Sequence, residues 1–564
     1  MATPTIDRFL SGLAQVVSSG NADELRNWVP IEPPFAPTYE QVIQEMRTRF
    51  PPLAPDDLER RYESDKVQVK TDPALASVKG STGDEWTGFS SFVAQYLLFI
   101  RDVNPSNLLD TYDKLTKLIE KCNTALNTPD VGVVMLPIAV VYAKVCARLA
   151  IGLEKQPELI ADFVEDPGDE GGESLSLPER AGNMIRTGLI ACLNDHATYP
   201  PNQPATPVGR HVGIYKLANI CLKIFFQSNK TKSAEQIFSQ VGAKSPPLHI
   251  YPRSERVTYL YYLGRFYFSL NHFYRAQAAL QAAYDDCHVQ ARNQRRLILI
   301  YLVTSNLILG RFPSESLYRK PEAQGFRERF QPLCHAIRKG DLPTFRRLTD
   351  MKNEHADWFI FHRIFMQIRS RCEVLVWRSL SRRVWLLVGG RGDRDAKRMP
   401  SLALEDLVVA AKYLESRALN SLSLSDGGPG NRHTNWVFMS QDPPQSARYI
   451  DPDFDGLESD EEFYDEEGVD EYKPFLLPDM MEVESIMSSL VSQGLVNGYV
   501  SSKKVLAIQG AQKKEAVEAG WPNVWQTMKA RCESQGRDVP GWKVAGSGFG
   551  GQVVNLSGAK PIGM

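Results

Sequence analysis

Several signatures of enzymes and metal sites are missing from this 564-residue sequence. Its nine histidines form neither an HxH nor an HExxH pair, and His355 and His362 stand seven residues apart, so we expect no zinc ligand set. The segment GGRGDR at 389–394 lacks the Gly-Lys-Ser/Thr of a phosphate-binding loop, and no serine lies in a nucleophile-elbow pattern. We therefore predict no catalytic residue, no metal and no cofactor, and we predict that the protein is not an enzyme.

Disulfide, secretion and membrane signals are also scarce. The eight cysteines are scattered and form no CxxC pair, which favours reduced, buried thiols of a cytosolic or nuclear protein. The N-terminal stretch contains Asp7 and no uninterrupted apolar core, so we expect no signal peptide. The most apolar run, 131–153, is interrupted by Pro137, Lys144 and Arg148 and is expected to be a buried helix pair and not a membrane span.

A large charge of one sign is absent as well. The formal net charge is −2, the hydrophobic share is 43% and the charged share is 23%, values typical of an ordinary soluble protein. Overall electrostatics therefore predict no affinity for nucleic acid, and any such binding needs a local basic patch.

What the sequence does contain is helical periodicity, and we predict a mainly α fold of several parts. Leu108, Tyr112, Leu115 and Ile119 are typical of its three-to-four spacing. The predicted parts are N-terminal helices with a Pro-rich linker (1–83), a helical region with acidic and Pro-rich loops (84–210), a helical-repeat region (211–400), a winged helix (401–515) and a C-terminal extension with a Gly-rich flexible tail (516–564).

An internal repeat lies in the helical stretch that begins at residue 211. Residues Leu263, Gly264, Tyr267, Ala276, Leu280 and Ala283 have the spacing of a tetratricopeptide unit, and a degenerate copy 42 residues earlier has Cys221, Leu222, Phe225, Ala234, Phe238 and Val241. Stacked helical hairpins of this kind bury one continuous core. The repeat therefore predicts a TPR-like helical solenoid, with an irregular helical bundle as the alternative.

The pattern changes after residue 385. A helix is predicted at 402–414, and a further helix begins near 479. Between them, residues 420–474 hold an acidic tract with twelve Asp or Glu between 451 and 472, a charge density that predicts disorder. We expect this insertion to act as a solvating linker or to compete with nucleic acid for a basic patch. The stretch LVNGYVSSKKVLAIQ then predicts a two-stranded wing with Lys503 and Lys504 at its tip.

Helices followed by a small wing, directly after a helical-repeat array, resemble the PCI domain of proteasome-lid, COP signalosome and initiation-factor subunits. The matching segments are YYLGRFYFSLNHFYRAQAALQAAYDDCH (261–288), RRLILIYLVTSNLILG (295–310), LCHAIRKGDLPTF (333–345), LEDLVVAAKYL (404–414) and the wing. The acidic insertion departs from the family pattern, in which only a short link joins the two helices of the winged helix. The resemblance implies a helical solenoid that ends in a winged-helix (PCI) domain with a small β wing.

Within that family, YPRSERVTYLYYLGRFYF and NQRRLILIYLVTSNLILGRFPSESL are similar to the branch that holds the PCI subunit of the nuclear transcription-and-export complex and its signalosome-associated paralogue. The resemblance implies a non-catalytic scaffold that couples transcription to nuclear mRNA export. Its implied partners are a larger PCI-domain scaffold protein, a small acidic peptide of the Sem/Dss type, and RNA or DNA bound without sequence preference. No membrane is expected among its partners. The implied location is the nucleus, including the nuclear pore, with a cytoplasmic fraction. The alternative is an assembly subunit of a signalosome- or proteasome-lid-like complex without a nucleic-acid role.

Clustered cations indicate where nucleic acid would bind if the winged helix packs on the end of the solenoid. The candidate residues are Arg378, Arg382, Arg383, Arg391, Arg394, Lys397, Arg398, Lys503, Lys504, Lys513 and Lys514. Such side chains contact phosphates without reading bases. Trp521 and Trp525 either stack on bases or close the domain.

Partner contacts are predicted on two surfaces. The helical face around 215–310 is rich in aromatic and arginine residues that suit a disordered acidic peptide, and the wing suits a PCI partner. The candidate residues are Arg253, Arg256, Tyr259, Tyr262, Arg265, Tyr274 and Arg292 on the helical face, and Leu495, Tyr499 and Val505 at the wing.

Overall fold

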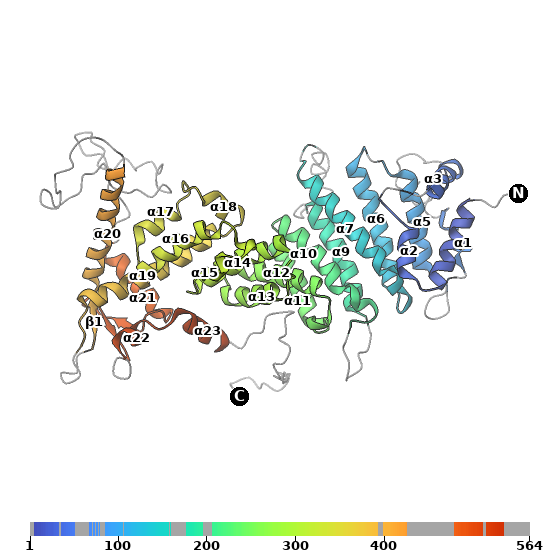
Figure 1. Ribbon diagram of the computed structural model, residues 1–564. Coiled ribbons are helices and arrows are strands. Elements are labelled where there is room, and N and C mark those ends of the chain that lie inside the picture. Colours follow the sequence, from blue (N-terminus) through green and yellow to red (C-terminus); the bar gives the residue numbers. More distant parts are fainter. Residues whose placement is uncertain are drawn as a thin grey trace, which may run out of the picture. The chain divides into compact units, whose positions relative to one another are not determined.

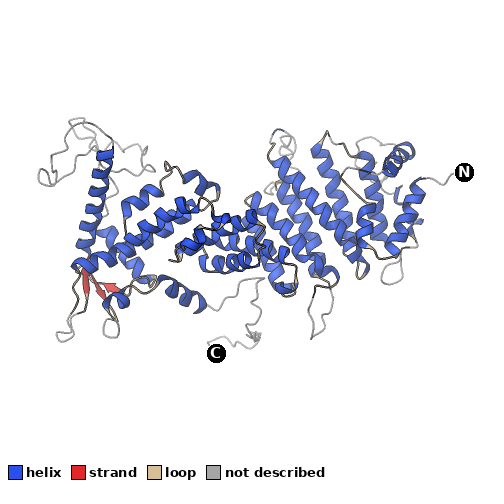
Figure 2. Cartoon of the chain, in the orientation of Figure 1, coloured by secondary structure: helices blue, strands red, loops and turns tan. Residues whose placement is uncertain are grey.

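Helices form almost wherever apolar residues recur every three or four positions (Figures 1 and 2). The computed structural model describes residues 5–32, 35, 37–50, 85–104, 106–156, 158, 176–195, 206–392, 399–425, 479–510 and 515–534, with scattered positions between 67 and 78. For residues 37, 38 and 419–425 it describes the backbone only. The described chain forms two units, one that ends at Phe266 and one that spans Tyr267–Arg537.

The first unit consists of helices. They are α1 (Thr5–Ser18), α2 (Ala22–Trp28), α3 (Pro37–Arg49), α5 (Thr87–Asp102), α6 (Leu108–Leu126), η1 (Val131–Met135), α7 (Leu136–Glu154), α9 (Leu177–Leu193), η2 (Gly209–Gly213), α10 (Ile214–Gln227), α11 (Thr231–Lys244) and η3 (Leu248–Ile250). Helix α12 (Arg253–Ser269) contains the boundary between the units. The helices that periodicity predicts for the first 210 residues are therefore present in the described part of that stretch.

The second unit continues with helices and ends in a small sheet. Its elements are α13 (Phe273–Asp286), α14 (Arg292–Ile308), α15 (Glu315–Tyr318), η4 (Pro321–Ala323), α16 (Phe326–Lys339), α17 (Leu342–Leu348), α18 (Ala356–Phe361), α19 (Phe365–Val388), β1 (Ser401–Ala403), α20 (Leu404–Ser425), α21 (Met480–Ser492), β2 (Gly498–Val500), β3 (Val505–Ile508), α22 (Ala516–Gly520) and α23 (Val524–Ser534).

The repeat positions lie in the core, as the tetratricopeptide spacing predicts. Cys221 of α10 and Ala234 of α11 are fully buried, and so are the matching Leu263 and Ala276 of α12 and α13. Small residues allow the close approach of neighbouring helices. A Cβ added to Gly182 of α9 would lie 2.4 Å from the ring of Phe225. The solenoid prediction is confirmed.

The most apolar segment is a core helix of the first unit. Residues Val131–Glu154 are long and apolar enough to cross a membrane by length and composition. Of their most apolar 18-residue stretch, 61% is buried inside the protein. Helix α7 packs against α6, α9 and α10. The predicted burial is confirmed, but the run forms one α-helix after the short 3-10 helix η1 and not a pair of helices.

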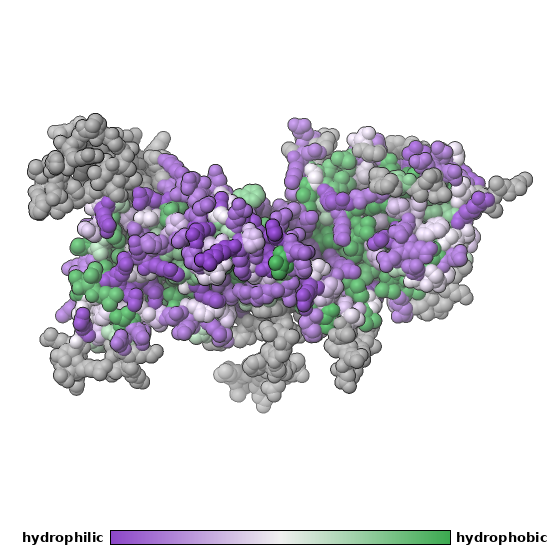
Figure 3. Space-filling model, in the orientation of Figure 1, coloured by the Kyte–Doolittle hydropathy of each residue, from purple (hydrophilic) through white to green (hydrophobic). Residues whose placement is uncertain are grey.

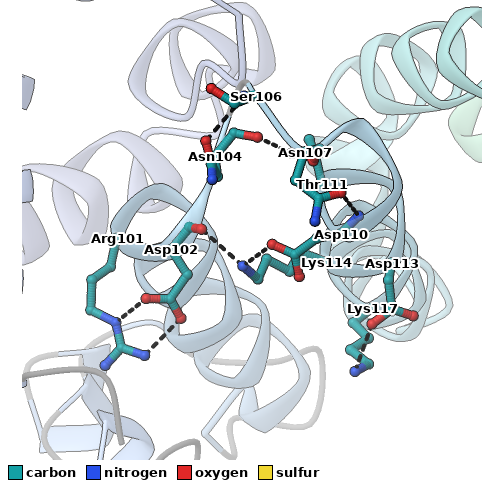
Figure 4. Close-up of polar contacts among 10 residues, drawn as sticks. All are labelled: Arg101, Asp102, Asn104, Ser106, Asn107, Asp110, Thr111, Asp113, Lys114 and Lys117. Atoms are coloured by element: carbon teal, nitrogen blue, oxygen red, sulfur yellow. Dashed lines mark hydrogen bonds and ion pairs between the residues drawn. The ribbon is translucent and has the colours of Figure 1, made fainter. Parts of the chain in front are cut away.

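The corner between α5 and α6 shows how polar groups hold the first unit (Figure 4). Asn107 caps α6 because its side chain accepts a hydrogen bond from the backbone N–H of Asp110. The buried guanidinium of Arg101 donates two hydrogen bonds to the Asp102 carboxylate, at 2.5 and 2.7 Å. The ammonium of Lys114 joins the two helices, since it donates to the Asp102 carbonyl at 2.9 Å and to the Asp110 carboxylate at 2.6 Å.

The last part of the second unit is a winged helix. The elements α19, β1, α20, α21, β2 and β3 follow one another, and β3 lies between β1 and β2 in an antiparallel sheet. Leu402 of β1 pairs with Leu506 of β3, and Tyr499 of β2 pairs with Ala507. Leu402, Leu506 and Ile508 are buried on the face toward the helices. The predicted two-stranded wing is confirmed, and Gly494 ends α21 with a positive φ of 73°.

Two features of the winged helix differ from the prediction. The third strand, β1, was not predicted because three residues are too few to show an alternating pattern. Helix α20 continues to Ser425, so the first residues of the segment expected at 420–474 are helical. The rest of the predicted insertion, including the acidic tract, lies outside the described residues.

Candidate nucleic-acid and partner interface

Arg378 holds the winged helix together and is not a surface cation. Its side chain projects from α19 and donates to the backbone carbonyls of Leu495, at 3.0 Å, and Pro522, at 2.5 Å. Burial, and then the neighbouring Arg382, lower the pKa of Arg378 to about 10. The guanidinium is used inside the protein, so the prediction that Arg378 binds nucleic acid is wrong.

The next turn of α19 carries exposed cations. Arg382 and Arg383 are both exposed. Arg383 donates to the carbonyl of Lys339 at 2.9 Å, at the end of α16, where Gly340 caps the helix in the left-handed conformation. A cation at this position is favourable because the C-terminal end of a helix carries a partial negative charge.

The tip of the wing presents two ammonium groups to solvent. Lys503 and Lys504 are exposed in the turn that joins β2 to β3, and Lys504 has a positive φ of 57°. The turn is closed by a hydrogen bond from the Lys504 N–H to the Ser501 carbonyl, at 2.9 Å. It is held to the start of α20, because the Lys504 carbonyl accepts from the Leu404 N–H at 3.0 Å.

Arg391 is the last of the predicted nucleic-acid-binding residues that the structure describes. The sheet separates it from the wing tip. Gly390, next to Arg391, bridges to Ser401 at the start of β1, whereas the wing tip lies beside Leu404, after the end of β1. Arg391 and the two lysines therefore lie at opposite ends of the pairing between β1 and β3. Arg394, Lys397, Arg398, Lys513 and Lys514 lie outside the described residues.

Helix α21 carries the wrong charge for insertion into a nucleic-acid groove. In winged-helix and helix-turn-helix proteins the second helix of the motif reads the groove with polar and cationic residues. Here α21 has the sequence MMEVESIMSSLVS, with Glu482 and Glu484 and no lysine or arginine. The sequence predicted this helix, but its charge was not weighed, although its composition already excludes a cationic face.

The two tryptophans have structural contacts. Trp521 is 5% exposed, and its Nε1–H donates to the Ser381 hydroxyl at 3.1 Å. Trp525 of α23 packs on Tyr274 at 5.6 Å between ring centroids, and the Arg311 guanidinium lies 4.6 Å from its ring. Of the two alternatives, the structure supports closure of the domain, and base stacking by Trp521 is excluded by its burial.

Several predicted partner contacts are internal. Tyr259 and Leu495 are 0% and 1% exposed, so the prediction that their side chains bind a partner is wrong. Tyr274 packs on α23 through Trp525 and donates to the Glu533 carboxylate at 3.2 Å. Part of the Tyr274 side chain that was assigned to a partner is therefore covered by α23, and the rest stays at the surface.

The other predicted partner residues remain at the surface to different degrees. Tyr262 stacks on Phe226 with 5.2 Å between ring centroids, and the Arg265 guanidinium lies 5.0 Å from the same ring. Arg256 is half-buried and donates to the His249 carbonyl at 3.2 Å. Arg253 and Arg292 are exposed, Val505 is half-buried, and Tyr499 is 46% exposed.

An exposed apolar surface at the wing was missed by sequence reasoning. Helix α19 ends with Leu386, Leu387 and Val388, and Leu387 is 84% exposed. Met399 and Tyr499 are also exposed, and the Tyr499 hydroxyl lies 4.0 Å from the Met399 sulfur. Figure 3 shows hydrophobic residues at the surface of the winged helix, while mostly hydrophilic ones cover helices α13 to α16. The signal available in the sequence is the unbroken run WLLV at the end of a helix.

The edge of the sheet next to Tyr499 is open. Among the described residues β2 pairs with β3 alone, so the other edge of β2 presents unpaired backbone groups. An open edge beside exposed apolar side chains is suited to docking another protein.

Comparison with known proteins identifies relatives, several of which are named for a PCI domain. No family model matches the chain. A PCI domain-containing protein of Schizosaccharomyces pombe is 24% identical over 422 residues, which is 75% of this chain and 86% of that protein. The chain is similar to PCI domain-containing proteins. A CSN12 homolog of Neurospora crassa is 31% identical over 229 residues, 40% of this chain and 47% of that protein. PCI domain-containing protein 2 of Xenopus laevis is 26% identical over 237 residues, 42% of this chain and 53% of that protein.

These names agree with the PCI resemblance that the helical repeat and the wing carry. The last two relatives match this chain over about half of their own length. The helical solenoid and winged helix of the described residues form the architecture that the PCI resemblance implies.

Proposed function

We propose that the protein is a non-catalytic scaffold subunit of a PCI-containing complex, in which its winged helix docks a larger PCI partner and helps to hold RNA or DNA during transcription-coupled nuclear mRNA export. The observations that carry the proposal are the open edge of β2 at the exposed Tyr499 and the exposed apolar residues at the end of α19. A monomer gains nothing from exposing such a surface, whereas a partner strand and apolar side chains would cover it.

Partner docking is tested by changing this surface without touching the core. Leu387→Asp combined with Tyr499→Asp places two charges on the apolar surface. These changes should remove a stoichiometric PCI-type partner from an affinity purification of the full-length protein. Both side chains are exposed, so the melting temperature should change little. A partner retained by the double variant at parental stoichiometry would contradict docking at this surface.

Nucleic acid would be held by the exposed cations of α19 and of the wing tip. Acidic α21 excludes insertion of that helix, so contact is limited to phosphates and tolerates any sequence. The near-neutral chain makes the affinity of one subunit modest, and a basic surface on the partner would add to it through avidity.

A charge-reversal experiment tests this second part. The fourfold variant Arg382→Glu, Arg383→Glu, Lys503→Glu and Lys504→Glu should abolish binding of a fluorescein-labelled single-stranded RNA. Single reversals should each lower the slope of log K against log salt by about one unit. The matched control reverses four exposed lysines of the first unit, Lys121, Lys155, Lys223 and Lys232, and carries the same change of net charge. Equal RNA affinity of the fourfold variant and the control, each within its complex, would remove the nucleic-acid role.

A second candidate function is an assembly subunit of a signalosome- or lid-like complex without nucleic acid. The carboxylates of α21 and the internal use of Arg378 favour it, because both reduce the positive charge available at the winged helix. In that case the apolar-surface variant loses its partner, while the charge-reversed variant behaves like the parent in every assay.

The small acidic partner is part of the same proposal. Arg253 and Arg292 are exposed and could pair with its carboxylates, each on its own unit. Co-expression with a Sem/Dss-type peptide should raise the soluble yield of the parent, and Arg253→Glu with Arg292→Glu should reduce that gain.

A further inference from the structure

A polar groove crosses the first unit on helices α6, α9 and α11, far along the chain from the winged helix. It consists of two depressions, one of about 840 Å³ between α6 and α9 and one of about 410 Å³ between α9 and α11. Asn183, Thr187 and Ile190 of α9 line both depressions, so the two are continuous. Helix α9 packs against α6 and α11, and the three helices can be followed in Figure 1.

The groove combines an apolar floor with walls of amides and hydroxyls. Met184, Ile190 and Ala191 of α9 supply apolar surface. The polar residues that surround them come from the three helices and from the residues that cap two of them. They are Thr116, Asn123 and Thr124 of α6 with its C-cap Asn127, Asn183 and Thr187 of α9 with its C-cap Asn194, and Ser233 and Gln236 of α11. Neutral hydrogen-bonding groups thus outnumber charged ones.

Arg186, which lines the groove, and Lys244, which lies outside the lining, hold three amides in fixed orientations. The Arg186 guanidinium donates to Oε1 of Gln236 and to Oε1 of Gln240, and the Lys244 ammonium donates to Oδ1 of Asn194 at 2.8 Å. Arginine and lysine have no acceptor, so these contacts require the amide oxygens, and each NH₂ group is left facing away from its cation. Asn194 and Gln236 line the groove and therefore carry pre-oriented N–H donors there, and Gln240 lies one turn further along α11 with its amide oriented by the same arginine.

The charges of the groove argue against nucleic acid. Three carboxylates line it, those of Asp113, Glu120 and Glu179, against two guanidinium groups, those of Arg180 and Arg186. A phosphate backbone needs an excess of cations. None of the lining residues is among the exposed large hydrophobic residues of the described chain, so the small apolar floor is a poor match for the wide apolar face of an amphipathic helix.

We propose that this groove binds an extended polypeptide segment of a partner protein through its main-chain carbonyl groups. An extended chain is neutral, places acceptors at regular intervals and directs alternate side chains to one side. The carbonyls accept from the amides of α9 and α11, and the alternate side chains lie on the apolar floor. Curved faces of stacked helical hairpins are suited to such extended ligands. The inference is independent of the winged-helix function.

The first experiment selects random 12-residue peptides by phage display on the full-length protein. Fluorescence polarisation then compares the best peptide on the parent and on the variant Gln236→Ala, Gln240→Ala. Loss of a hydrogen-bond donor to a neutral acceptor should weaken binding about fivefold per donor, so the double variant should bind more than tenfold more weakly. The matched control is Glu235→Ala, Ser239→Ala, which truncates two exposed neighbours on α11 that neither line the groove nor accept from Arg186, and it should bind like the parent.

A second pair of variants tests the orientation of the amides. Arg186→Met leaves Gln236 and Gln240 free to rotate and should weaken peptide binding, although it removes a positive charge from the surface. Arg186→Lys should restore part of the affinity, because lysine can still donate to one of the amide oxygens. Ester replacement of single peptide bonds in the selected peptide should weaken binding at alternate positions, since an ester carbonyl is the poorer acceptor.

Three outcomes would overturn the proposal. One is the recovery of no peptide whose affinity falls with the change at Gln236 and Gln240. Another is equal binding by the double variant and its control. The third is displacement of the selected peptide by single-stranded RNA at physiological salt, which would assign the groove to nucleic acid. A thermal melt of each variant confirms folding, and Arg186→Lys serves in place of any double variant that does not fold.

Discussion

Replacement of Arg378 by methionine separates the structural role of this residue from a surface role. Methionine keeps most of the apolar stem and removes the guanidinium. Two carbonyls, those of Leu495 and Pro522, then lose their donors at the junctions that lead into β2 and α23.

The expected loss follows from the two bonds and from burial. A hydrogen bond from a charged donor contributes about 1.5–3 kcal/mol, and the cost of burying the guanidinium, visible in its lowered pKa, offsets part of the sum. We therefore expect the free energy of unfolding to fall by about 2–4 kcal/mol. For a unit of this size that corresponds to a drop in melting temperature of roughly 5–10 °C.

The matched control is Arg382→Met, one turn further along α19. This side chain is exposed, so its truncation should change stability by less than about 0.5 kcal/mol. Differential scanning calorimetry gives the melting temperatures, and RNA titration at several salt concentrations gives the binding slopes. Arg378→Met should lower the melting temperature and leave the salt slope of the folded protein unchanged, whereas Arg382→Met should do the reverse.

A parental melting temperature for Arg378→Met, together with a reduced salt slope, would refute this reasoning. It would mean that the two carbonyl contacts contribute little and that the guanidinium meets phosphate after all.

Three further predictions concern the solenoid, the insertion and the thiols. Gly182→Ala places a methyl group against the ring of Phe225, and the overpacking should cost about 1–3 kcal/mol in chemical denaturation; an unchanged midpoint would contradict the close approach of α9 and α10. Replacement of residues 426–478 by a flexible Gly/Ser link should leave the melting temperature nearly unchanged and RNA binding equal or stronger, and loss of soluble protein would show that the segment is structural. Seven of the eight cysteines are buried, so iodoacetamide at pH 8 should modify Cys532 first in the folded protein, as peptide mass spectrometry can verify; burial also raises the pKa of Cys532, so the reaction should speed up as the pH rises further.

The architecture was largely determined by local pattern. Helical periodicity and the spacing of small and aromatic residues predicted the solenoid, because a helix buries residues on one face and the same offsets recur in each hairpin. The polar turn at 501–504 between two short apolar runs predicted the wing, because polar residues of this kind suit a tight turn between strands. The short strand β1 escaped prediction because its hydrogen bonds come from β3, more than a hundred residues later.

The candidate sites depended on tertiary structure. Arg378 and Arg382 look alike in the sequence, and only the folded chain shows that one meets two carbonyls while the other faces solvent. Tyr259 and Leu495 are likewise ordinary surface candidates until neighbouring helices cover them. The amides of Gln236 and Gln240 acquire a direction only from Arg186, which lies about fifty residues earlier on another helix. Composition and periodicity report which face of an element is buried, but the partner that a polar group meets depends on contacts between elements distant in the sequence.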